Sequence, residues 1–88
     1  MAKQILITKA FNDGNKVLFK KGKPTYKNLI TLCKEIGERL NIPYKNVFYR
    51  IKAWENGISS FRVNSKDVLD LFFELLCIEK ENYIIDYE

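Results

Sequence analysis

Residues 33–51 read CKEIGERLNIPYKNVFYRI and place a short break, Asn41-Ile42-Pro43, between two amphipathic segments. The apolar residues before the break recur at helical spacing, which predicts a helix over Thr25–Asn41: they are Leu29, Leu32, Cys33, Ile36 and Leu40. A helix rarely continues through the residue before a proline, whereas proline is well tolerated as the first residue of a new helix. We therefore expect a second helix to begin at Pro43 and to end near Gly57.

Gly37 lies inside the first expected helix, four residues before Asn41. Glycine at such a position costs about 1 kcal/mol relative to alanine, so a close crossing by the second helix is the physical reason to keep it. The wedge between the two helices would be filled by the apolar residues on either side of the break, Leu40, Ile42, Val47 and Ile51. This pattern predicts two short helices packed at a steep angle across a tight turn.

Residues 33–51 resemble the helix-turn-helix superfamily, with the spacing of Cro-like and other phage or plasmid regulators, over about a quarter of the chain. The turn residue of that family is most often glycine. Here it is Asn41, which also tolerates the left-handed backbone conformation. The resemblance implies that the protein binds duplex DNA and that the second helix is the recognition helix, with its N-terminal residues directed at base edges in the major groove.

If Val47, Ile51 and Trp54 face inward, the DNA-facing residues of the second helix are Tyr44, Lys45, Asn46, Phe48, Tyr49, Arg50 and Lys52. Tyr44 and Lys45 are the first candidates for a base or an adjacent phosphate. Tyr49 is suited to a phosphate or a thymine methyl group, and the edge position of Arg50 favours a phosphate. The alternative for the two tyrosines is ordinary packing, and for Lys45 and Lys52 it is a solvated surface.

Two β-rich runs flank Asn12-Asp13-Gly14-Asn15, a sequence typical of tight hairpin turns. We therefore expect a hairpin that pairs Gln4–Ala10 with Lys16–Lys20, and a possible third strand at Ile58–Val63. Two segments are candidates for a DNA-contacting wing, the hairpin with Lys20, Lys21 and Lys23, and the third strand with Arg62. The hairpin precedes the two helices, whereas the usual wing follows the recognition helix. The expected fold is a single α+β domain over residues 1–88, winged-helix-like, with a C-terminal apolar helix.

The C-terminal helix is expected over Val68–Glu79, after a sequence that resembles a capping box, Asn64-Ser65-Lys66-Asp67. It is apolar almost all round, and an exposed apolar stripe usually marks an interface. This favours a homodimer through Val68–Glu79 and the YIIDYE tail. The alternative is that the hairpin and the first helix cover both sides of it. The tail is either a last short strand or a loosely docked end.

The net charge of +4 is unevenly distributed, which favours a polyanionic partner for the first two-thirds of the chain. Up to Arg62 there are 13 Lys and Arg residues against 4 acids, and from Val63 onward 2 against 7. The alternative is an ordinary solvated lysine surface. The sequence has no histidine and no glycine-rich phosphate loop, so we expect no enzymatic activity, no cofactor and no metal site.

The cellular setting is expected to be the cytoplasm. No stretch approaches the roughly 20 apolar residues of a membrane span, and the N-terminus lacks the features of a signal peptide. Cys33 and Cys77 have apolar neighbours, which predicts two reduced core thiols.

Together these observations predict a sequence-specific duplex DNA-binding protein, a small transcriptional regulator or recombination accessory factor of phage or plasmid type. The alternative is a protein-binding module, an inhibitor or adaptor, on a helix-turn-helix scaffold that does not read DNA. Its working surface would be the apolar C-terminal helix and the acidic tail. RNA binding is a third possibility, favoured if Tyr44, Phe48 and Tyr49 are exposed as stacking groups.

Overall fold

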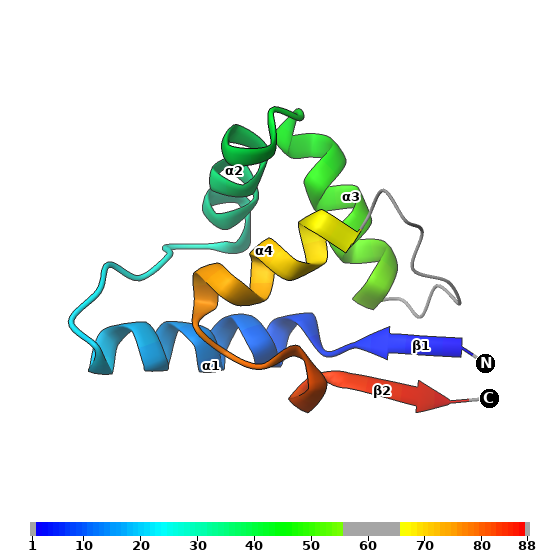
Figure 1. The fold of residues 1–88 in the computed structure, drawn as a ribbon, viewed down its shortest axis with the longest axis horizontal. Coiled ribbons are helices and arrows are strands. Elements are labelled where there is room, and N and C mark those ends of the chain that lie inside the picture. The colour runs from blue at the N-terminus through cyan, green and yellow to red at the C-terminus, as the bar shows by residue number, and fades with distance from the viewer. Residues whose placement is uncertain (1, 56–65, 88) are drawn as a thin grey trace.

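The computed structural model describes residues 2–55 and 66–87, and their dominant element is the α-helix (Figure 1). The elements in chain order are β1 (Ala2–Ile5), α1 (Ile7–Lys20), α2 (Leu29–Leu40), α3 (Tyr44–Glu55), α4 (Lys66–Leu76), a short 3-10 helix η2 (Lys80–Asn82) and β2 (Ile84–Tyr87). The expected α+β, winged-helix-like fold is therefore wrong. The described residues form a helical domain with one small two-stranded sheet.

The predicted hairpin is wrong because Gln4–Ala10 and Lys16–Lys20 do not pair, and residues 7–20 form the single helix α1. The turn-like sequence 12–15 lies in the middle of this helix. Its buried residues follow helical spacing: Ile7, Ala10, Gly14 and Leu18. A Cβ atom on Gly14 would lie 2.6 Å from the Cβ of Leu76, so the glycine permits close packing of α1 against α4. Burial of one helical face thus outweighs the local turn preference.

The sheet joins the two ends of the described chain (Figure 1). β1 pairs with β2 in antiparallel register, from Ala2 opposite Tyr87 to Ile5 opposite Ile84. The tail is therefore a last short strand, one of the two predicted alternatives. The candidate third strand, Ile58–Val63, and the first two residues of the predicted capping box, Asn64 and Ser65, lie outside the described residues.

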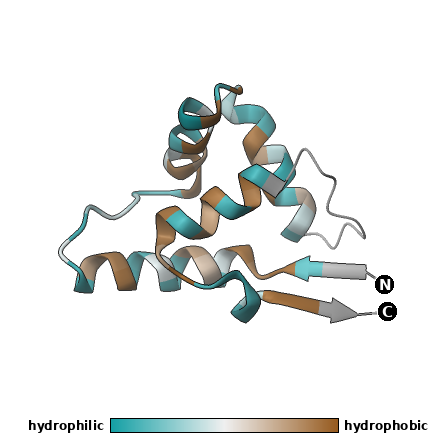
Figure 2. Ribbon diagram, in the orientation of Figure 1, coloured by the Kyte–Doolittle hydropathy of each residue, from teal (hydrophilic) through white to brown (hydrophobic). Residues whose placement is uncertain are grey.

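The corner formed by α2 and α3 lies at one edge of the molecule and α1 along the opposite edge (Figure 1). α4 packs against both α1 and α2. Figure 2 shows hydrophobic and hydrophilic residues alternating along the helices, as expected where one face is buried. The largest fully buried side chains come from the helices α1 to α4 and from β1, and they include Ile5, Ile7, Leu32, Ile36, Ile51 and Phe72.

Helix α4 ends at Leu76, three residues earlier than expected, because Cys77 adopts a left-handed backbone with φ of 57°. Its core-facing residues are Val68, Leu69, Phe72, Phe73 and Leu76, and its exposed residues include Asp67, Asp70 and Glu74. The expected exposed apolar stripe is therefore not present on the described part of this helix. Helices α1 and α2 pack against the apolar side of α4. The homodimer stays a prediction, but the exposed apolar stripe from which it was predicted is not present on the described part of α4.

Among the residues that the structure describes, no helix is both long and apolar enough to span a bilayer.

Candidate nucleic-acid interface

Helix α2 begins with a side-chain cap at Asn28 rather than at the expected Thr25. The Asn28 Oδ1 accepts hydrogen bonds from the backbone N–H and the hydroxyl of Thr31, both at 2.9 Å. The preceding segment is held against α1, because Asn15 Nδ2 donates to the Tyr26 carbonyl at 3.0 Å and Asn15 Oδ1 accepts from the Tyr26 N–H at 2.9 Å. These two bonds fix where the chain enters α2.

The turn between α2 and α3 has the predicted geometry. Asn41 adopts the left-handed conformation, with φ of 58° and ψ of 46°, and its N–H donates to the carbonyl of Gly37. The Ile42 N–H donates to the same oxygen at 2.9 Å. The Pro43 carbonyl accepts the first hydrogen bond of the next helix, from the Asn46 N–H at 3.0 Å, so α3 begins at Tyr44. Pro43 thus lies just before the first helical residue, so the predicted start of the helix at Pro43 is one residue too early.

Gly37 is buried at the point where the two helices approach. A Cβ atom on this residue would lie 2.5 Å from the Ile42 carbonyl oxygen and 3.3 Å from the Tyr44 Cα. Both neighbours are backbone atoms, which cannot rotate away as a side chain can. The prediction that glycine is needed for a close helix crossing is confirmed.

Helix α3 has one buried and one exposed face, as predicted. Val47 and Ile51 are fully buried and Trp54 is nearly so. Lys45, Asn46 and Tyr49 are exposed, and Tyr49 as a whole residue is 70% exposed. The remaining predicted contact residues are half-buried: Tyr44, Phe48, Arg50 and Lys52.

A shallow hollow of about 280 Å³ lies between the start of α2 and the outer face of α3. It is lined by Ile30, Tyr44, Lys45, Phe48 and Tyr49. The Phe48 and Tyr49 rings meet edge to face, with centroids 6.5 Å apart, and the Lys34 Nζ lies 5.2 Å from the centroid of the Tyr44 ring. Aromatic surface bordered by lysine is suited to a sugar-phosphate backbone or a base edge.

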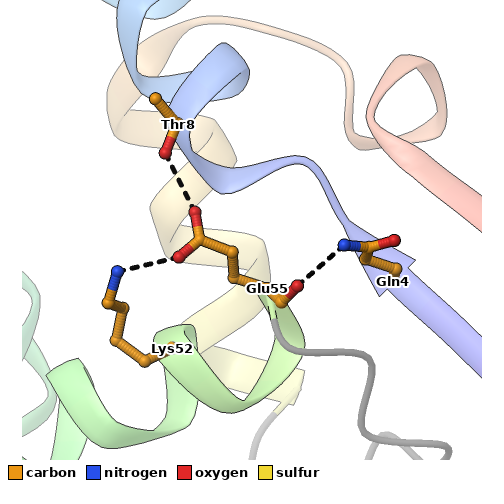
Figure 3. Close-up of polar contacts among 4 residues, drawn as sticks. All are labelled: Gln4, Thr8, Lys52 and Glu55. Carbon is orange, nitrogen blue, oxygen red and sulfur yellow. Dashed lines mark hydrogen bonds and ion pairs between the residues drawn. The ribbon is translucent and has the colours of Figure 1, made fainter.

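The C-terminal end of α3 is anchored to the start of the chain through Glu55 (Figure 3). Its carboxylate lies 2.8 Å from the Lys52 Nζ and accepts a hydrogen bond of 2.9 Å from the Thr8 hydroxyl. Its backbone carbonyl accepts from the Gln4 side chain at 2.9 Å. The bond from Lys52 is the main reason that the pKa of Glu55 lies below its ordinary value. The charge of Lys52 is therefore compensated within the protein.

Of these anchoring residues, sequence reasoning identified Lys52 alone, and as a DNA contact. The i, i+3 spacing of Lys52 and Glu55 was the available local signal. Thr8 and Gln4 are 47 and 51 residues from Glu55, so no local pattern connects them.

The three lysines assigned to the hairpin lie at the end of α1 and just after it. Lys20, Lys21 and Lys23 are exposed, and the Lys23 Nζ lies 3.9 Å from the Sγ of Cys77. They do not form a wing, since the hairpin does not exist. Arg62, assigned to the other possible wing, lies outside the described residues.

Comparison of the chain with models of protein families, with curated protein sequences and with solved structures found no match. Over the described residues the chain is a small helical domain in which α2 and α3 meet at a tight corner, with Lys45, Asn46 and Tyr49 exposed on the outer side of α3.

Proposed function

We propose that this protein binds duplex DNA through α3 and acts in the cytoplasm as a small transcriptional regulator or recombination accessory factor. The observation that carries the proposal is the tight corner at Gly37 and Asn41, which holds α3 with Lys45, Asn46 and Tyr49 outward. A helix presented in this way fits the major groove of B-DNA. The proposed activity needs neither catalysis nor a cofactor.

The exposed residues of α3 have side chains suited to reading DNA. Lys45 and Asn46 lie in the first turn, where a recognition helix contacts base edges. Asparagine pairs in a bidentate manner with adenine, and lysine donates to guanine. The first turn of α3 contains no acidic residue, so the partial positive charge of the helix N-terminus is available to a phosphate. Tyr49 lies one turn further along and is suited to a phosphate or a thymine methyl group.

The two alternative functions receive less support. The protein-binding alternative relied on an exposed apolar surface on α4, whose apolar residues are buried or half-buried and whose exposed positions include Asp70 and Glu74. RNA binding relied on three exposed aromatic residues. Tyr49 is exposed, whereas Tyr44 and Phe48 are half-buried.

The test is a fluorescence-anisotropy titration with a mixed-sequence DNA duplex at about 50 and 200 mM salt, since phosphate contacts weaken steeply over this range. The variant is Lys45→Ala/Asn46→Ala. The matched control, Lys80→Ala/Asn82→Ala, removes the same two residue types from η2. Circular dichroism checks that both variants are folded.

We expect wild type and the control to bind with strong salt dependence. The α3 variant should bind several-fold more weakly and with a salt slope lower by about 1, because binding to mixed-sequence DNA rests on phosphate contacts and the variant loses that of Lys45. Equal weakening of variant and control would show that α3 is not the DNA-reading surface. Absence of binding by wild type at low salt would refute the function itself.

A further inference from the structure

The outer face of α1 carries a row of lysines that the proposed function does not use. The inner face of α1 is buried against the core, through Ala10, Gly14 and Leu18 among others. At helical spacing, the opposite face presents Lys9, Lys16 and Lys20, all exposed. We call these three residues the α1 lysine row. With 1.5 Å of rise per residue, they are spaced about 10 and 6 Å apart along the helix axis.

The charges of the α1 lysine row are not compensated by described residues. The one acidic residue of α1, Asp13, accepts a hydrogen bond of 2.8 Å from the Tyr83 hydroxyl, and no described carboxylate lies within ion-pair distance of the row. Three other cations of the described residues do have ion pairs: Arg39 with Glu35, Lys52 with Glu55 and Lys80 with Asp70. Among the predicted contact cations of α3, Lys52 is paired in this way, whereas Lys45 is exposed and has no ion pair with a described residue. A dense group of unpaired lysines attracts a polyanion.

The α1 lysine row points away from the α2–α3 turn. The face of α1 opposite the row packs on α4, where Gly14 approaches Leu76, and α4 in turn packs on α2. Figure 1 shows α4 between α1 and the turn, with α1 along one edge of the molecule and the turn at the other. The domain measures 27 Å along its intermediate axis, the direction that separates these two edges in Figure 1. The start of α3 and the α1 lysine row therefore lie toward opposite edges of the domain.

We propose that the α1 lysine row is a second duplex-binding surface, so that one molecule bridges two DNA segments. This inference rests on the proposed function, because it requires that α3 hold the first duplex. The intervals of about 10 and 6 Å between neighbouring lysines correspond to roughly three and two nucleotide steps along a strand, at about 3.4 Å of rise each. Phe19, beside the row and 79% exposed, supplies an apolar contact to a sugar.

A membrane surface fits the α1 lysine row less well than a second duplex does. An amphipathic helix binds a bilayer by inserting its apolar face. In α1 that face is buried in the protein core, through Ile7, Ala10 and Leu18, which leaves Phe19 alone for insertion. Because α1 has no free apolar face to insert into a bilayer, its lysines are better suited to the phosphates of a nucleic acid than to a lipid surface.

The test is a bridging assay with the full chain. One duplex is fixed to beads through biotin, a second duplex carries a fluorophore, and the protein is added at a concentration that saturates the first. The variant is Lys16→Gln/Lys20→Gln, and the control, Lys27→Gln/Lys80→Gln, has the same net charge with the row intact. All four positions lie outside the buried core, and circular dichroism confirms folding. Anisotropy with a single short duplex is measured in parallel.

Wild type and control should capture the second duplex. The row variant should lose most of that capture, roughly fivefold or more for two lost phosphate contacts, while its affinity for a single duplex changes little. If wild type binds a single duplex but captures no second one, bridging is wrong and the proposed function stands. If wild type binds no duplex, both fail.

Three further outcomes would overturn the assignment of the second surface. If the row variant loses single-duplex affinity in parallel with capture, α1 and α3 hold the same duplex. Capture that the row variant retains in full would come from another source, such as a homodimer. Absence of bridging, with row-dependent binding to vesicles that contain phosphatidylserine, would identify a lipid surface instead.

Discussion

Replacement of Gly37 by alanine should destabilise the domain, although alanine is the better helix former. The gain in helix propensity is about 1 kcal/mol. The new Cβ would lie 2.5 Å from the Ile42 carbonyl oxygen and 3.3 Å from the Tyr44 Cα and N atoms, so the corner between α2 and α3 must open. Overpacking commonly costs about 1–3 kcal/mol, and a clash with backbone atoms belongs at the upper end. The expected net loss is about 2 kcal/mol.

Thermal unfolding followed by circular dichroism measures this loss. For a domain of this size, 2 kcal/mol corresponds to a decrease of roughly 8–16 °C in Tm. The control is Glu38→Ala, at an exposed position in the same helix, which should change stability by less than about 0.5 kcal/mol. A Gly37→Ala protein that melts at or above the wild-type temperature would refute the close crossing. If the proposed function holds, the variant should also bind DNA more weakly, because α3 is displaced.

Three further predictions concern other parts of the structure. Glu55→Gln should cost about 0.5–1 kcal/mol near neutral pH, after allowance for the partly exposed Lys52. The pKa of Glu55 is below its ordinary 4.5, so the stability that its carboxylate contributes is complete above pH 4.5 and is lost as the pH falls through the folded-state pKa. The urea midpoints of Glu55→Gln and wild type should therefore converge in acid. Burial raises the pKa of Cys33 to about 11, so iodoacetamide near pH 8 should label Cys33 only after unfolding. The half-buried Cys77 should be labelled in the folded protein, and mass spectrometry distinguishes the two sites. At Asn41, where φ is 58°, valine should lower stability by about 1–2 kcal/mol and glycine should leave it nearly unchanged. Similar melting of the two Asn41 variants would contradict the left-handed turn.

The α2–α3 corner was predictable because its constraints are local in sequence. Gly37, Asn41 and Pro43 each have a backbone requirement that restricts the residue type, and all lie within seven positions. The apolar spacing of Val47 and Ile51 then determines which face of α3 turns inward. Such short-range steric rules operate in any fold that contains the corner, so they could be applied without knowledge of the rest of the chain.

The first helix was missed because its turn-like residues have tertiary roles that the sequence does not display. Gly14 gives α4 room at Leu76, Asp13 accepts from Tyr83, and Asn15 binds the backbone of Tyr26. Residues that locally favour a turn are thus retained in a helix by distant partners. The pairing of β1 with β2 joins opposite ends of the chain and has no local signature either.

The exposed face of α3 was predicted from spacing, but its polar environment was not. Tyr44 and Lys52 were expected to be exposed, and both are half-buried. Lys34 lies over the Tyr44 ring, and Lys52 is turned toward Glu55. Helical periodicity gives the direction of a side chain and says nothing of which neighbour it meets. The cations that α3 could offer to the proposed DNA partner are therefore fewer than a count of lysines along the helix suggests.

Helix α1, which the sequence predicted to be a hairpin, takes part in positioning the proposed interface. The geometry of the corner is set within α2 and α3, and α1 helps to fix its placement on the domain together with α4 and β1. Asn15 holds the segment that leads into α2, and Thr8 binds Glu55 at the end of α3. One helix thus helps to orient α3 from its inner side and presents the α1 lysine row on its outer side. Because a single rigid element connects the two surfaces, two bridged duplexes would be held at a fixed relative angle.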